Sequence, residues 1–191
     1  MRTTLLLTVV GEDRTGLVES LAKRIADAGG NWEESRLARL AGQFSGIVVV
    51  TVEASRADAL TAALRELEAT GFWVTARVIP PQAPQAGAAP RQDSRGEAIA
   101  AHAAGGAGSR VRLAVTGSDR PGIVRDVCRR LAARGVNVEE LESNVRSAPM
   151  SGEAMFVARA RLLVPPHVAL GDVQTDLEAL ANELMVDFSA E

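Results

Sequence analysis

The sequence predicts an α+β fold in which one βαββαβ module occurs twice, each copy having an antiparallel sheet with helices on one face. Three observations predict it. A segment recurs at an offset of 106 residues, a stretch rich in alanine, glycine and proline separates the copies, and both copies show the same order of hydrophobic patterns. We therefore expect one domain at residues 1–79, a flexible linker at 80–109 and a second domain at 110–191.

The repeat is clearest from Gly11 to Glu34, which aligns with residues 117–140 without a gap. Identical residues occupy 11 of these 24 columns, far more than chance would give. The duplication of a whole domain is the simplest explanation.

The hydrophobic pattern of each copy predicts four strands and two helices. Alternating residues indicate strands at Arg2–Val10, Trp32–Leu40, Ser45–Glu53 and Trp73–Ile79, and at Arg110–Thr116, Val138–Arg146, Ala154–Val164 and Met185–Ser189. Helical spacing relates Leu17, Leu21 and Ile25, then Leu60, Leu64 and Leu67, and in the second copy Ile123, Val127 and Leu131, then Val173, Leu177, Leu180 and Leu184. Gly29 and Gly135 follow the first helix of each copy and predict its end, because glycine accepts the left-handed conformation there.

The segment from Pro80 to Ser109 has the composition of a linker. Of its 30 residues, 10 are Ala, 5 are Gly and 4 are Pro, and Ile99 is its only large aliphatic residue. Such a segment buries too little apolar surface to offset its ordering entropy. As a flexible coil it would span roughly 30 Å, enough for the two domains to pack side by side.

Composition excludes several classes of protein. The net charge is -3 and no basic block stands out, so we expect no direct binding of nucleic acid. Cys128 is the only cysteine, which excludes an internal disulfide and suits a cytoplasmic location. The N-terminus resembles neither a signal peptide nor a membrane span. His102 and His167 have no ligand-like spacing, so we expect neither a metal site nor a cofactor.

The most specific local feature is an Asp-Arg-x-Gly turn, at Asp13–Gly16 and again at Asp119–Gly122. Its glycine lets a ligand approach the backbone, and the start of the helix behind it favours a carboxylate. The aspartate can accept hydrogen bonds from an ammonium group, so the turn suits an α-amino acid. The alternative is that the aspartate only caps the helix.

Asn31 and Asn137 form a second candidate feature, each 15 residues after the turn glycine and at the start of the second strand. We expect that position to lie beside the first turn. An amide both donates and accepts hydrogen bonds, which suits an amino-acid backbone. The alternative is a turn residue in the left-handed conformation.

These turns, the glycine–asparagine spacing and the βαββαβ order resemble the ACT domain, a ferredoxin-like regulatory module that binds amino acids. Two longer strings, at residues 30–46 and 177–188, are similar to the first and second ACT domains of glycine cleavage system transcriptional repressor-like proteins. The resemblance covers both domains and omits the linker.

The resemblance implies ligand sites at an interface between two domains. The matching positions are Asp13, Arg14, Gly16, Leu17 and Asn31 in the first copy, and Asp119, Arg120, Gly122, Ile123 and Asn137 in the second. The first copy has Thr15 where the second has Pro121, a mild departure because proline there mainly presets φ.

We expect no catalytic residues. Cys128 lies in a helix without an activating base, so we interpret it as a packed thiol. Glu33–Glu34 and Glu139–Glu140 are adjacent on strands, so their carboxylates should point to opposite faces. Trp32 and Trp73 are interpreted as packing anchors, with Trp32 also a candidate for an interface.

The leading functional hypothesis is a non-enzymatic regulator of amino-acid metabolism that binds glycine or a similar amino acid. The resemblance implies transcriptional control of the glycine cleavage system through a transcriptional activator, and we expect a homodimer. One alternative is an accessory subunit of an amino-acid-metabolising enzyme. The other is a scaffold that binds no ligand.

Overall fold

The computed structural model describes residues 1–80, 108–148, 152–180 and 184–190. The N-terminal unit, residues 1–80, has its elements in the predicted βαββαβ order. These elements are β1 (Arg2–Glu12), α1 (Leu17–Asp27), β2 (Asn31–Leu40), β3 (Gln43–Glu53), the short η1 (Ala54–Arg56), α2 (Ala57–Arg65), η2 (Glu66–Thr70) and β4 (Phe72–Ile79).

The C-terminal unit, described from residue 108 onward, repeats this order. Its elements are β5 (Ser109–Ser118), α3 (Ile123–Ala133), β6 (Asn137–Ser147), β7 (Ala154–Val164), α4 (Leu170–Glu178) and β8 (Leu184–Ala190). The predicted linker lies almost entirely in 81–107, outside the described residues.

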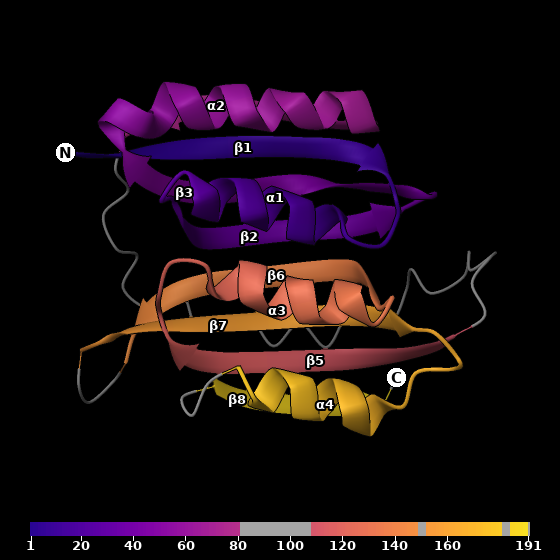
Figure 1. Ribbon diagram of the computed structural model, residues 1–191. Coiled ribbons are helices and arrows are strands. Elements are labelled where there is room, and N and C mark those ends of the chain that lie inside the picture. The colour runs from indigo at the N-terminus through magenta and orange to yellow at the C-terminus, as the bar shows by residue number, and fades with distance from the viewer. Residues whose placement is uncertain (81–107, 149–151, 181–183, 191) are drawn as a thin grey trace.

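All eight strands form one antiparallel sheet, in the order β4-β1-β3-β2-β6-β7-β5-β8. The second half of this order mirrors the first, so the two units are related by an approximate twofold axis between β2 and β6. The helices cover one face of the sheet, and α1 and α3 lie side by side over the central strands (Figure 1). The predicted α+β fold with helices on one face is confirmed.

The seam between the units is a short pairing of β2 with β6. Ser35 pairs with Ser143 and Leu37 with Leu141, and all four side chains are buried beneath the helices. The Oγ atoms of the two serines are 2.8 Å apart, and Trp32 Nε1 donates to Ser143 Oγ at 3.2 Å. The seam is therefore both apolar and specifically hydrogen-bonded, and Trp32 belongs to this interface as well as to the core.

The predicted helix ends at glycine are confirmed. Gly29 and Gly135 follow α1 and α3 with φ of +72° and +71°, in the left-handed region where glycine has no Cβ penalty. Their amides bond to carbonyls of the preceding turn, which closes each helix.

Two sequence-based expectations about packing are wrong. Trp73 is 53% exposed, because it lies on the edge strand β4 and faces the side of the sheet without helices. Leu180 and Leu184 were expected to continue the last helix, but α4 ends at Glu178 and Leu184 begins β8. Leu184 packs against the core from that strand, so its apolar character reflects burial of a strand face and not a helix face.

Candidate functional site

The structure brings the predicted turn residues together with the predicted asparagines, but crosswise. Asn137 of the C-terminal unit donates its Nδ2 to Asp13 of the N-terminal unit, at 3.1 Å from both carboxylate oxygens. Asn31 of the N-terminal unit donates to Asp119 Oδ2 of the C-terminal unit at 2.9 Å. Each asparagine was expected beside a turn, and the turn that it meets belongs to the other unit.

This geometry gives two sites between the units, related by the approximate twofold axis. The Asp13 site comprises Asp13, Arg39, Asn137 and Glu139. The Asp119 site comprises the matching residues of the other copy, namely Asp119, Val145, Asn31 and Glu33, and Thr51 joins it through a bond to Glu33. Each candidate site therefore takes residues from both units.

The turn aspartates do not cap the helices that follow them. Gly16 and Gly122 occupy the N-cap positions of α1 and α3, with φ of +88° and +86°, and neither described helix start has a side-chain capping bond from its N-cap residue. The alternative that Asp13 and Asp119 are capping residues is therefore wrong. A helix start without a side-chain cap remains a favourable place for a carboxylate.

The asparagines are not left-handed turn residues either. Asn31 and Asn137 are the first residues of β2 and β6, and Ala41 is the only non-glycine residue with positive φ among those the structure describes. Asn31 is buried, with 7% of its surface exposed. An amide held at the start of a buried strand is positioned to bind, since the strand fixes its backbone.

A β-bulge in the second strand of each unit brings a glutamate side chain into each site. The register of β2 shifts between Trp32 and Glu34, and that of β6 shifts between Val138 and Glu140. The extra residues are Glu33 and Glu139, which the bulge frees from the simple alternation of faces. The expectation that neighbouring glutamates separate to opposite faces did not anticipate this feature.

Glu139 is the most buried charged group of the Asp13 site, with 1% of its side chain exposed. Arg110 binds it with two hydrogen bonds, of 2.9 and 3.2 Å, and Arg39 Nη1 donates to its Oε1 at 3.0 Å. Burial opposes ionisation of this carboxyl, but the hydrogen bond of Arg110 and the charges of Arg110, Arg161 and Arg39 outweigh it and lower its pKa. Glu139 is therefore a structural anion, and sequence analysis missed it.

Arg39 joins the two carboxylates of the Asp13 site. Its Nε lies 2.8 Å from Asp13 Oδ2, while its Nη1 bonds to Glu139. Asp13 thus has an arginine and an asparagine as partners, and its side chain is only 9% exposed. The positive charge required to balance this site comes from the protein itself.

The polar groups of the Asp119 site have different hydrogen-bond partners from those of the Asp13 site. Asn31 Nδ2 donates to Glu33 Oε1 at 3.3 Å as well as to Asp119, and Thr51 Oγ1 donates to the same Glu33 oxygen at 2.5 Å. The Oδ1 atoms of Asn31 and Asp119 are buried and have no hydrogen-bond partner among the described residues. Burial raises the pKa of Asp119 and the charge of Glu33 adds to this, although the bond from Asn31 opposes it.

The remaining predicted site residues flank these clusters. Arg14 donates to the carbonyl of Thr70 at 3.2 Å, and Arg120 donates to Asp126 at 2.9 Å, so both guanidinium groups are engaged within their own units. Leu17 and Ile123 are buried at the helix starts. The amide of Ile123 donates to the carbonyl of Arg120 at 3.3 Å.

A small crevice opens beside the Asp13 site, between α1 and the start of β6. Residues of both units line it, namely Arg14, Gly16, Leu17, Val18, Glu19, Cys128, Ala132, Val136, Asn137 and Val138. Its volume is about 10 Å³, room for about one water molecule. A larger ligand requires side chains at this boundary to move.

The cysteine, the possible metal ligands and the helices offer little further chemistry in the part of the chain that the structure describes. Burial raises the pKa of the Cys128 thiol to about 12, so it is a packed thiol at neutral pH, as the sequence indicated. No group of three or more histidine, cysteine, aspartate or glutamate side chains there could hold a metal ion. None of the helices described is long and apolar enough to cross a membrane.

Solved structures include three similar folds. An unknown protein from Galdieria sulphuraria is 26% identical over 100% of this chain and 99% of its own, with a TM-score of 0.41. A proposed glycine cleavage system transcriptional repressor is 17% identical over the same shares, also with a TM-score of 0.41. The aspartate kinase of Synechocystis is 16% identical, covering 92% of this chain and 26% of its own, with a TM-score of 0.49. A comparison with curated proteins found no match.

The family assignment comes from the sequence of each unit. The ACT domain family matches residues 3–72 and, separately, residues 111–169. Together these matches span more than half of the chain and include both Asp-Arg-x-Gly turns and both asparagines. The chain therefore belongs to the ACT-domain proteins and carries two ACT domains in tandem.

Proposed function

We propose that this protein is a non-enzymatic sensor of a small amino acid, which binds between its two ACT domains. The crosswise bonds from Asn31 to Asp119 and from Asn137 to Asp13 carry this proposal, because they bring an amide, a carboxylate and a helix start together at the domain boundary. An α-amino acid offers one cation and one anion close together. Its ammonium group suits the carboxylate, and its carboxylate suits the uncapped helix start.

Ligand binding at this boundary would change how the domains pack. An amino acid that bonds to Asp119 or Asp13 competes with the asparagine of the other domain for the same oxygens. Binding therefore exchanges a bond between domains for bonds to the ligand, and the relative stability of the two packing arrangements shifts accordingly. A protein partner that contacts both domains would detect that shift.

The most direct test is titration calorimetry of the full chain with glycine, L-serine and other small amino acids. A measurable heat of binding supports the sensor hypothesis. If none of them binds at millimolar concentration, which corresponds to about -4 kcal/mol of binding free energy, the hypothesis is wrong.

Regulation of the glycine cleavage system is the specific role that we propose for this sensor. The strings at residues 30–46 and 177–188 favour it through their similarity to the repressor-like proteins. The output would then be a contact with a transcriptional activator, which accords with a net charge of -3 and no basic stripe in the sequence. Affinity purification with and without glycine tests this role, and recovery of an amino-acid-metabolising enzyme in place of a transcription factor would favour the accessory-subunit alternative.

A further inference from the structure

The two sites between the domains carry the same carboxylates but not the same cations. Asp13 and Glu139 correspond by position in the repeat to Asp119 and Glu33. At the next matching position of the second strand, however, the N-terminal unit has Arg39 and the C-terminal unit has Val145. A valine cannot form an ion pair, so the approximate symmetry breaks at this position.

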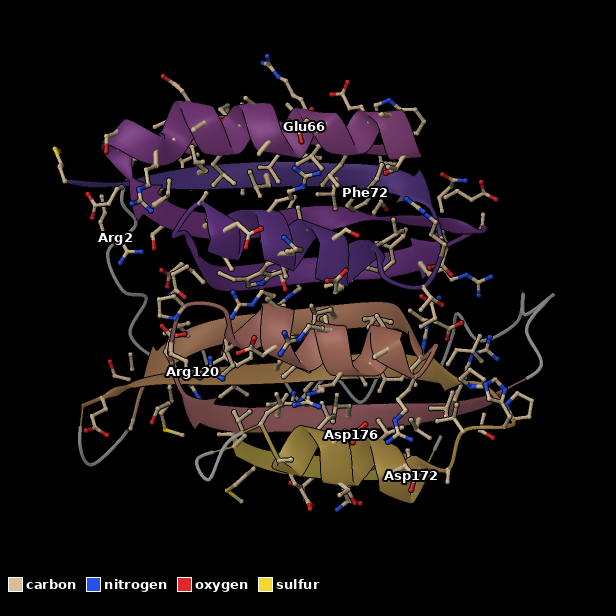
Figure 2. The ribbon with its side chains drawn as sticks, in the orientation of Figure 1. Arg2, Glu66, Phe72, Arg120, Asp172 and Asp176 are labelled. Carbon is tan, nitrogen blue, oxygen red and sulfur yellow. The ribbon has the colours of Figure 1, made fainter. Side chains whose placement is uncertain are left out.

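Arg39 marks where a cation lies in such a site. Its guanidinium spans the two carboxylates of the Asp13 site, with 2.8 Å to Asp13 and 3.0 Å to Glu139. Among the residues that the structure describes, no arginine forms an ion pair with Asp119 or Glu33. The charge of Arg2 (Figure 2) lowers the pKa of Asp119. Its Nη2 donates to the carbonyl and the Oγ1 of Thr51, and it forms no ion pair with Asp119 or Glu33 among the described contacts.

Two buried oxygen atoms without partners also indicate a cation site at Asp119. Asn31 is more than nine-tenths buried, yet within the described part of the chain its Oδ1 has no hydrogen-bond partner, and neither has Asp119 Oδ1. Buried polar atoms are costly when unpaired, and the cost is greatest where a carboxylate lacks a counter-charge. Both acceptors would gain a partner if a group with several N–H donors entered the Asp119 site.

We propose that the two sites are unequal: the ligand's ammonium group binds in the Asp119 site, between Asp119 and Glu33, whereas Arg39 permanently occupies the equivalent position of the Asp13 site. This inference rests on the proposed amino-acid sensing and deepens it, because it assigns one ligand to each chain. A primary ammonium has three donors and matches the acceptors available, namely Asp119, Glu33 and Asn31 Oδ1.

The proposal also gives the Asp13 site a distinct role. There the positive charge belongs to Arg39, a residue of β2. The contacts among Asp13, Arg39, Asn137 and Glu139 therefore hold the domains together both with and without ligand. A ligand ammonium there would have to displace a guanidinium that already contacts both carboxylates. One site therefore anchors the interface and the other responds.

Calorimetry on the full chain with glycine and L-serine tests the inequality through matched variants. We expect one equivalent bound per wild-type chain and at least about tenfold weaker binding for N31A. N144A, which alters an asparagine of β6 outside both sites, is the matched control and should change binding by no more than about twofold. V145R, which copies Arg39 into the Asp119 site, should weaken binding by at least about tenfold. R39V removes the arginine partner of Asp13, although Arg110 and Arg161 still pair with Glu139, and it should raise the number bound to two.

Two equivalents per wild-type chain, or binding that is unchanged in both N31A and V145R, would overturn the inequality while leaving amino-acid sensing intact. A simpler probe separates the two hypotheses if no amino acid binds. Methylammonium, titrated while the side-chain amide resonances of Asn31 and Asn137 are recorded by NMR, should move the Asn31 resonance and leave that of Asn137 in place. Equal shifts, or none, would show that the Asp119 site has no special affinity for a cation.

Discussion

Ser35 and Ser143 share a buried hydrogen bond of 2.8 Å between their Oγ atoms, across the strand pair that joins the two domains. Ser143 also accepts the indole N–H of Trp32, whereas Ser35 has no such second partner in its hydroxyl contacts. The side chains of both serines lie beneath the helices, away from solvent. The interface therefore depends more on the hydroxyl of Ser143 than on that of Ser35.

Replacing Ser143 by alanine should lower the free energy of unfolding by about 2 kcal/mol, because it leaves both Trp32 Nε1 and Ser35 Oγ without a partner in a buried seam. Ser35→Ala should cost about 1 kcal/mol, since Ser143 still bonds to Trp32. Urea denaturation measures both values, with the exposed Ser147→Ala as control. Equal effects of the two seam substitutions would show that the Trp32 contact contributes nothing.

Glu139→Gln should destabilise the protein by about 2 kcal/mol at neutral pH, because it removes the buried anion shared by three arginines. This loss in the free energy of unfolding is smaller than for a fully buried ion pair, since the side chains of Arg110 and Arg161 are 34% and 31% exposed. The folded pKa of Glu139 lies below its ordinary value of 4.5, so its stabilisation is present above that value and is lost as the pH falls below it.

Chemical denaturation at a series of pH values separates this contribution from others. The loss caused by Glu139→Gln should shrink as the pH falls through the region below 4.5. The control is Glu142→Gln, whose pair with Arg36 has both side chains 50% exposed and should contribute no more than about 1 kcal/mol. A constant difference between wild type and Glu139→Gln at every pH would contradict the role of its charge.

Asp119→Asn should make the ligand-free protein more stable at neutral pH. Burial raises the pKa of Asp119 in the folded state above its ordinary value of 3.8, so the stability of the wild type falls as the pH rises from that value through the raised one. An amide at position 119 has no charge to bury, and its nitrogen can donate to the unpartnered Asn31 Oδ1.

Melting temperatures between pH 3 and 7 would show this effect as a flatter pH dependence in Asp119→Asn than in wild type. Asp187→Asn, at an exposed position of β8, serves as the control and should follow the wild-type curve. The same Asp119→Asn variant should lose amino-acid binding. A variant that is both less stable and fully competent in binding would rule out our interpretation of this carboxylate.

Gly16→Ala should destabilise the protein by about 1 kcal/mol, since its φ of +88° places an L-residue in the left-handed region although no atom lies within 4 Å of the added Cβ. Gly171→Ala provides a matched control. It also meets no neighbour within 4 Å, but it lies in α4 with an ordinary φ and should stabilise the protein by about 0.5 kcal/mol. Similar effects of the two substitutions would mean that the turn conformation is not what restricts position 16.

Much of this fold follows from sequence periodicity, because hydrophobic alternation and helical spacing report which face of each element is buried. Those patterns located the strands, the helix ends at Gly29 and Gly135, and both turns. They do not show which strands pair between the domains. Ser35 and Ser143 look like ordinary polar residues of a strand, and only the register of β2 against β6 makes them buried partners.

The candidate site was predictable in its residue types and not in its connections. Asn31 and Asn137 were found from their spacing after the turn glycine, but a spacing within one copy cannot show that each asparagine meets the other copy's aspartate. Glu139 was missed because a β-bulge, which has no clear sequence signal here, places it in the interior. One sequence difference, Arg39 against Val145, was available in the repeat and distinguishes the two sites.

The central claim is that an amino acid binds at the domain boundary in contact with Asn31 and Asp119. A crystal structure of the full chain grown with saturating glycine or L-serine tests it most directly. We predict one ligand per chain, with its ammonium between Asp119 and Glu33, its carboxylate at the start of α3, and the 2.9 Å bond from Asn31 to Asp119 broken or rearranged. A ligand bound elsewhere, or an unchanged Asn31–Asp119 bond with the boundary empty while glycine binds in solution, would contradict the account.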